Sequence, residues 1–116
     1  MKRWEVTATG HFVEWYHTLQ EAQADALDAR VELLRDHGPT LGRPIVDRTS
    51  GSSLHSLKEL RVRSDGELRV LFIFDSDRRA VLLVGGDKTG RWEVWYEKAV
   101  PLAEDLYEQY SRRRNA

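Results

Sequence analysis

An α+β fold, with helices packed on one face of a mostly antiparallel sheet, is predicted by three features of this 116-residue sequence. Apolar residues have helical spacing in two early segments and one late segment, and the segments between them have strand-like spacing. A glycine-containing turn joins two of the central apolar segments and indicates a β-hairpin. The resulting order, β-α-α-β-β-β-α, is typical of a layered α+β sandwich.

The first third of the chain is predicted to form one strand and two helices. Residues 4–8 alternate between apolar and polar side chains, as in a strand with one buried face. Residues 12–19 and 24–34 repeat apolar side chains every three or four positions, and Gly38-Pro39 is a helix-ending signal. Residues 38–56 are rich in Gly, Pro, Ser and Thr and predict a long loop.

The central hairpin has the most informative pattern. Ser64-Asp65-Gly66 is typical of a three-residue loop, a type I turn followed by a left-handed glycine. Such a loop places Val62 opposite Leu68 on an apolar face. The same register places Arg61 directly opposite Arg69 on the other face, where like charges destabilise a sheet. We therefore expect an anionic group to compensate these two arginines.

The rest of the chain is predicted to complete the sheet and add a last helix. Residues 80–84 are apolar throughout, as in a strand buried on both faces, and residues 75–79 form the turn before it, which gives a three-stranded meander. Residues 92–96 alternate and predict a short extended or irregular piece. Pro101 is expected to start the helix, with apolar side chains on one face of residues 102–110.

The face that carries the arginines is expected to be open to solvent or to a ligand, and two interpretations of it remain. Glu59 lies two residues from Arg61 on this face, and Glu67 lies opposite Arg63 in the expected register. These residues, with Arg69, can form an ordinary solvated ladder of alternating charges. Alternatively, the face binds an anion.

Residues 85–90, with the sequence Gly-Gly-Asp-Lys-Thr-Gly, superficially resemble a nucleotide-binding loop. The Walker pattern requires glycine directly before the lysine and a helix directly after it. Here Asp87 precedes Lys88 and an extended segment is expected to follow, so nucleoside triphosphate binding is excluded. Lys88 can still contact one phosphate at the end of a strand. The alternative is a flexible glycine turn with a solvated lysine.

Histidines and aromatic residues supply weaker signals. The four histidines are scattered without the spacing of metal ligands, so no metal site is expected. His55, just before the arginine-bearing strand, can act as an acid or base near pH 7, or it can be an exposed loop residue. Trp92, Trp95 and Tyr96 can stack on nucleic-acid bases or belong to the core.

Composition limits the class of protein. The length predicts a single domain over residues 1–116, and the absence of cysteine excludes disulfides and thiolate nucleophiles. A net charge of −1 argues against indiscriminate nucleic-acid binding. No apolar run approaches the roughly 18 residues of a membrane span, and the first residues lack the apolar core of a signal peptide. We therefore expect no membrane partner and a cytoplasmic protein.

Three segments together resemble the RelE/HigB toxin superfamily, particularly its phage Gp49-like HigB branch. Residues 57–63 resemble the "K-x-L/E-L-R" strand of that branch, and residues 66–72 resemble its "x-x-R-v-l-f" strand. Residues 81–89 resemble its "v-x-L-L-x-g-f-x-K-K-t" strand and loop. Tyr96 and the final helix also match its C-terminal pattern. The order of elements matches over residues 4–110, and the discriminating motifs lie within residues 57–99.

The resemblance implies a RelE-like fold and the toxin of a type II toxin–antitoxin system, a ribosome-dependent endoribonuclease that inhibits translation by cutting mRNA. Such enzymes use no metal or other cofactor and promote attack of an RNA 2′-hydroxyl on the adjacent phosphate. This reaction needs a base, an acid and cations that stabilise the phosphorane. The resemblance assigns the phosphate clamp to Arg61 and Arg69, and charge stabilisation or proton transfer to Lys88.

The same resemblance makes Asp87, Tyr96 and His55 further candidates for acid–base or positioning roles. It implies a small helix-turn-helix antitoxin, the ribosome and mRNA as partners. The sequence departs from the family in two respects. Asp87-Lys88 replaces the paired lysines, and the chain is slightly acidic where these toxins are commonly basic.

Two alternatives to the nuclease remain. A ParE-like relative poisons a topoisomerase without enzymatic activity, and shared architecture does not separate it from a nuclease. An inactive interaction module is the second alternative. The arginine pair together with Lys88 favours the nuclease.

Overall fold

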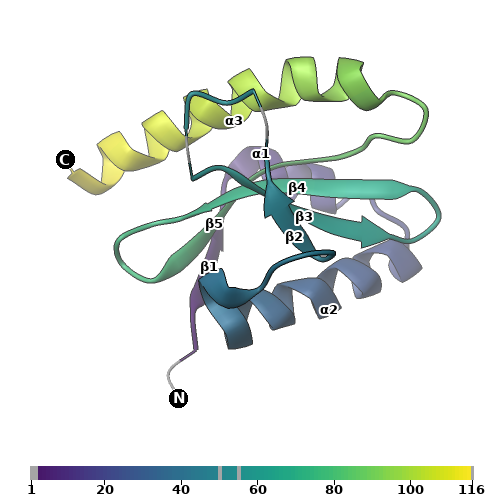
Figure 1. Ribbon diagram of the computed structural model, residues 1–116, viewed down its shortest axis with the longest axis horizontal. Helices are drawn as coiled ribbons and strands as arrows, with labels where there is room; N and C mark the ends of the chain where they lie inside the picture. Colours follow the sequence, from purple (N-terminus) through teal and green to yellow (C-terminus); the bar gives the residue numbers. More distant parts are fainter. Residues whose placement is uncertain (1–2, 50, 55, 116) are drawn as a thin grey trace.

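The computed structural model describes residues 3–49, 51–54 and 56–115, which form a five-stranded mixed sheet with helices on both faces (Figure 1). The strands are β1 (Glu5–Ala8), β2 (Val46–Arg48), β3 (Lys58–Arg63), β4 (Glu67–Phe74) and β5 (Arg79–Asp87). The helices are α1 (Gly10–Tyr16), α2 (Glu21–His37) and α3 (Trp92–Asn115), with a 3-10 turn at Gly38–Thr40. The sheet order is β1-β5-β4-β3-β2, with β1 parallel to β5 and the other neighbours antiparallel. The predicted α+β fold is confirmed.

The central hairpin has the predicted register. Val62 of β3 pairs with Leu68 of β4, and Arg61 pairs with Arg69. The loop has three residues, as expected, but the left-handed conformation begins one residue early, because Asp65 has φ 46° and Gly66 has φ 137°. Burial decides this register, since a shift by one residue would exchange the apolar and charged faces.

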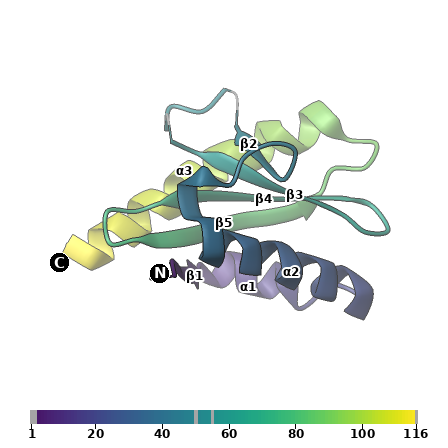
Figure 2. The same ribbon diagram turned by 60° about the horizontal axis from the view of Figure 1, so that its bottom comes forward.

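Helices cover both faces of the sheet, so the prediction that they lie on one face is wrong. Helices α1 and α2 lie against one side and α3 lies against the other (Figure 2). Val70 and Phe72 of β4 belong to the core beneath α1 and α2, whereas Leu71 and Ile73 belong to the core beneath α3. A central strand that is apolar at successive positions needs cover on both faces.

Helix α3 begins earlier than predicted and contains Pro101 in its interior. The expected extended piece over residues 92–96 is therefore helical. Trp95, Ala99 and Ala103 are four residues apart and are all buried against the sheet, which explains the helical phase. Neither α3 nor any other helix among the described residues is long and apolar enough to cross a membrane.

Two consecutive glycines let aromatic side chains approach β5 from opposite faces. A Cβ atom on Gly85 would lie 2.1 Å from the ring of Trp15 in α1. A Cβ atom on Gly86 would lie 2.2 Å from Nε1 of Trp95 in α3. These glycines therefore belong to the strand, not to a flexible turn, and they allow the two helical layers to close over its end.

Strand β2 lies within the segment that was predicted to be a long loop. It has only three residues and pairs with β3, with Val46 opposite Leu60 and Asp47 opposite Glu59. This short edge strand brings the residues that follow it beside the arginine-bearing strand. The loop prediction is thus wrong for residues 46–48.

Candidate functional site

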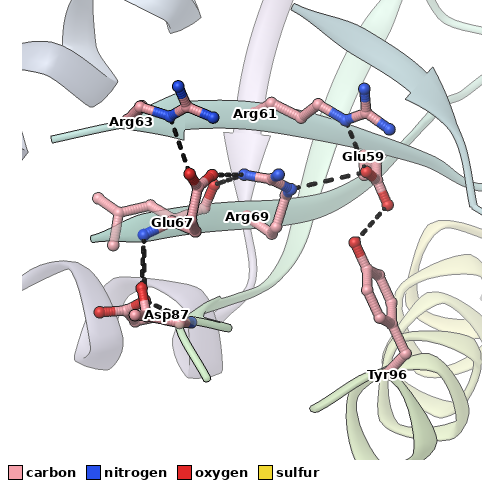
Figure 3. Close-up of polar contacts among 9 residues, drawn as sticks. Glu59, Arg61, Arg63, Glu67, Arg69, Asp87 and Tyr96 are labelled. Atoms are coloured by element: carbon pink, nitrogen blue, oxygen red, sulfur yellow. Dashed lines mark hydrogen bonds and ion pairs between the residues drawn. The ribbon is translucent and has the colours of Figure 1, made fainter. Parts of the chain in front are cut away.

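Alternating charges form a continuous ladder on the α3-facing side of β3 and β4 (Figure 3). Arg63 Nε lies 2.8 Å from Glu67 Oε1, and Arg69 Nη1 lies 3.3 Å from Glu67 Oε2. Glu59 Oε2 lies 2.8 Å from Arg61 Nε and 3.6 Å from Arg69 Nε. The anionic groups that compensate the opposed arginines are therefore the chain's own Glu59 and Glu67. We call these five residues the charge ladder.

Burial divides the two arginines of the expected clamp. The side chain of Arg61 is 36% exposed, whereas that of Arg69 is 7% exposed. Arg69 also donates a 2.8 Å hydrogen bond to the carbonyl oxygen of Leu68. The expectation of an open arginine face is wrong for Arg69, because Tyr96 and Lys88 lie close to it. Arg61 remains accessible.

Tyr96 links the charge ladder to α3. Its hydroxyl donates a 2.9 Å hydrogen bond to Glu59 Oε1. Burial and this bond raise the pKa of Tyr96 to about 12. The phenol therefore stays protonated at neutral pH and acts as a hydrogen-bond donor there.

Lys88 lies beside Tyr96 at the end of β5. It is only 2% exposed, and its Nζ atom lies 5.4 Å from the centroid of the Tyr96 ring, within range of a cation–π contact. Burial lowers the pKa of Lys88, and the nearby Arg69 cation lowers it further, whereas Glu59 opposes the change. The alternative interpretation of Lys88 as a solvated lysine is therefore wrong.

A cavity of about 600 Å³, which we call the main cavity, opens beside Arg61. Its charged lining residues are the cations Arg43, Arg48, Arg61 and Lys88 and the anions Asp47 and Glu59. Cations thus outnumber anions, so the cavity is suited to an anionic ligand. Among the described residues, no group of three or more His, Asp or Glu side chains is placed to hold a metal ion.

Arg61 also lines a second cavity, of about 410 Å³. Its charged lining residues are Arg30, Arg61, Arg63, Arg69 and Glu67. Arg61 borders both cavities, so the two basic regions are adjacent. An extended polyanion can follow this surface across Arg61.

Asp87 is a predicted site residue that lines neither of these two cavities. Asp87 accepts hydrogen bonds from the Thr89 amide at 2.9 Å and from the Glu67 amide at 3.2 Å. Burial acts to raise the pKa of Asp87, but hydrogen bonds from Thr89 and Glu67 outweigh it and hold the pKa below its ordinary value. Asp87 is thus tied into the turn that follows β5. His55 lies outside the described residues.

The sequence profile of the phage derived protein Gp49-like family matches residues 14–108 of this chain. The chain belongs to this family. It is 41% identical over 96 residues to the putative toxin HigB3 of Mycobacterium tuberculosis, and the match covers 83% of each chain. It is also 38% identical to the putative toxin HigB2 of the same organism, where the match covers 83% of this chain and 49% of HigB2.

Solved structures confirm the RelE-like fold of this Gp49-like chain. A variant of the Escherichia coli toxin RelE in the free state has a TM-score of 0.64 at 12% identity, covering 87% of this chain and 97% of that one. The toxin–antitoxin complex RelBE2 of M. tuberculosis contains a chain with a TM-score of 0.51 at 18% identity, covering 73% of this chain and 98% of that one. The Gp49-like chain is thus a member of the RelE/HigB superfamily of toxins from toxin–antitoxin systems.

Sequence reasoning missed the wall of the main cavity that comes from β2 and the residues after it. Asp47 Oδ2 lies 3.2 Å from Arg61 Nη2 and 3.2 Å from Arg43 Nε, and Thr49 lies two residues further along the chain. The β-branched pair Ile45-Val46 was the available signal for a strand here. The Gly, Pro and Ser residues around this pair are typical of a loop, and they outweighed the strand signal.

We expect Lys88 of this Gp49-like toxin to lose its proton at a lower pH in the folded protein than in the unfolded chain. Its pKa falls below the ordinary 10.5 on folding, so between the two values the unfolded chain binds more protons. The contribution of Lys88 to the free energy of unfolding therefore rises with pH across that window. Side-chain NMR of lysine during an alkaline titration, with K88M to assign the signal, measures this shift. Identical titration in the folded protein and in urea would contradict it.

Proposed function

We propose that this chain is a ribosome-dependent mRNA endonuclease and that the main cavity is its active site. The observation that carries the proposal is the convergence of Arg61, Lys88 and Tyr96 on one net-cationic cavity. The HigB relatives are named as putative toxins, which supports a toxic activity for this chain as well. The adjoining basic cavity offers a path along which an RNA strand can approach.

The proposed reaction is attack of an RNA 2′-hydroxyl on the neighbouring phosphate. The 2′-oxygen bonds to phosphorus while the bond to the 5′-oxygen breaks, which leaves a cyclic phosphate and a free 5′-hydroxyl. Arg61 would stabilise the charge that develops on the phosphorane oxygens. Lys88, an ammonium with a lowered pKa, would donate a proton to the leaving 5′-oxygen. Glu59 and Asp47 are carboxylates in the cavity that can accept the proton of the 2′-hydroxyl.

Arg69 would act as a positioning residue rather than as half of a clamp. Its guanidinium lies between Glu59 and Glu67 and is almost fully buried. The buried Arg69 holds Glu59 in place, and Glu59 in turn pairs with Arg61. Arg69 thus fixes the orientation of the arginine that meets the phosphate.

We propose that the ribosome supplies the affinity and the bent RNA geometry that this chain lacks. A net charge of −1 gives little long-range attraction to free RNA. Catalysis would therefore depend on an mRNA already held in a near-attack conformation. Arg61 and Lys88 supply cationic charge at the phosphate, and we propose that cleavage requires no metal bound by the toxin.

We further propose that a small antitoxin of the helix-turn-helix type neutralises this chain. The RelBE2 neighbour is a toxin–antitoxin complex, which supports a partner of this class. Co-expression with the product of the neighbouring gene is expected to yield a stable complex and to restore growth. Failure to form a complex at micromolar concentrations would contradict this partner.

Induced expression in bacteria tests the proposed function. We expect incorporation of labelled amino acids to stop before incorporation of labelled thymidine, because the target is mRNA on the ribosome. A topoisomerase poison of the ParE kind would reverse that order. An inactive interaction module would leave both unchanged, and either result would contradict the proposal.

A further inference from the structure

Thr49, directly after β2, has a buried hydroxyl with no partner in the described part of the chain. The residue is 8% exposed, and its Oγ1 atom makes no hydrogen bond there. A buried hydroxyl without a partner costs free energy relative to its hydrated state. Valine has nearly the same shape and would avoid this cost. The chain nevertheless carries threonine at this position.

Thr49 is one of the residues that line the main cavity, and its unpartnered hydroxyl is buried directly behind that wall. Ser52 lies in the same wall, but its hydroxyl is already engaged, because it donates to Glu104 Oε2 at 2.9 Å and accepts from the Leu54 amide at 3.0 Å. The described surroundings therefore supply hydrogen-bond partners to the hydroxyl of Ser52 but not to that of Thr49. The Thr49 hydroxyl, in contrast, has no partner among the described residues, and a ligand that displaces the side chains around it would supply one.

The surroundings of Thr49 indicate which part of a ligand it meets. Arg61 and Lys88 supply the positive charge that a phosphate needs. Thr49 is neutral, and the cavity also contains the apolar side chain of Leu54 and the aromatic ring of Tyr96. A neutral hydrogen-bonding group beside apolar and aromatic surface suits a nucleoside better than a phosphate.

We propose that the hydroxyl of Thr49 hydrogen-bonds to a polar atom of the nucleoside, on its base or its ribose, whose phosphate lies at Arg61. This inference rests on the proposed function and adds a residue that selects or positions the nucleotide. A site built to hydrogen-bond a polar group discriminates against a ligand that cannot satisfy it. Thr49 would therefore contribute to which nucleotide is cut, in addition to how tightly RNA is held.

Two substitutions separate this role from a structural one. T49V removes the hydroxyl and keeps the shape, and T49S keeps the hydroxyl. NMR titrations of the purified full chain and both variants with each ribonucleoside 3′-monophosphate, and with inorganic phosphate, measure the affinities. We expect T49V to bind at least one nucleotide about 10-fold more weakly, the size of a lost hydrogen bond. Its phosphate affinity should be unchanged, and T49S should bind like the wild type.

Thermal unfolding of T49V provides the second readout. We expect its Tm to equal or exceed that of the wild type, because the hydroxyl has no partner within the described fold. A clear loss of Tm would show that the hydroxyl supports the fold and would overturn the proposal. Nucleotide affinities that are the same in T49V and wild type would also overturn it, while leaving the proposed nuclease intact. A wild-type cavity that binds no nucleotide would overturn the role of Thr49, whereas the proposed nuclease is tested separately by cleavage of mRNA on the ribosome.

Discussion

Replacement of Glu59 by alanine is expected to lower the free energy of unfolding by about 3–5 kcal/mol, the range for breaking a buried ion pair by removing one partner. Glu59 is 4% exposed, and its carboxylate contacts Arg61, Arg69 and the Tyr96 hydroxyl. Without the Glu59 carboxylate, the buried Arg69 loses one of its two anionic partners while it still lies opposite the cationic Arg61. Urea denaturation followed by circular dichroism measures the change.

Two control variants make this result specific. E59Q keeps the volume and some hydrogen bonds, so it should be destabilised less than E59A. R63A should change stability by less than about 1 kcal/mol, because Arg63 is 84% exposed and its ion pair with Glu67 is screened by solvent. Equal small effects for E59A and R63A would show that the charge ladder does not support the fold.

Replacement of Arg61 by alanine is expected to reduce mRNA cleavage by about 10²–10³-fold, the typical cost of removing one group that stabilises a developing oxyanion. Arg61 is the accessible member of the opposed pair Arg61 and Arg69, and it borders both basic cavities. Its side chain is partly solvated, so we expect R61A to lose only about 1 kcal/mol of stability. The large loss of activity should thus come with a nearly intact fold.

R61K is the matched control for this prediction. Lysine keeps the positive charge but lacks the planar fork that binds phosphate oxygens at two points. We expect mRNA cleavage by R61K to lie between that of the wild type and that of R61A. Growth inhibition during induced expression, together with thermal unfolding of each purified variant, checks both. Full toxicity of a folded R61A protein would show that Arg61 is not part of the active site.

The hairpin register was predictable because burial and loop length act together on a few neighbouring residues. Val62 and Leu68 must share an apolar face, and this requirement alone places Arg61 opposite Arg69. The second helical layer was not predictable in the same way. The alternation seen over residues 92–96 is too short to separate a strand from a helix, and only the spacing of Trp95, Ala99 and Ala103 against the sheet resolves it.

The candidate site was predictable in part for a similar reason. The hairpin register predicts Arg61, the loop after residue 84 predicts Lys88 and the family resemblance adds Tyr96. The structure brings all three to one cavity. The burial of Arg69 depends on tertiary contacts with Lys88 and Tyr96, which no local pattern encodes. Thr49 was missed because β2 is defined by its pairing with β3 and not by its own three residues.

Mapping mRNA ends in a purified translation reaction is the most direct measurement of the central claim. Wild-type protein should produce new ends within the codon in the ribosomal A site, unaffected by EDTA at levels that keep ribosomes intact, and R61A should leave the same mRNA whole. The wild-type protein should cut free RNA poorly. Intact mRNA with the wild-type protein, or vigorous magnesium-dependent cutting of free RNA that R61A retains, would contradict a ribosome-dependent active site at Arg61.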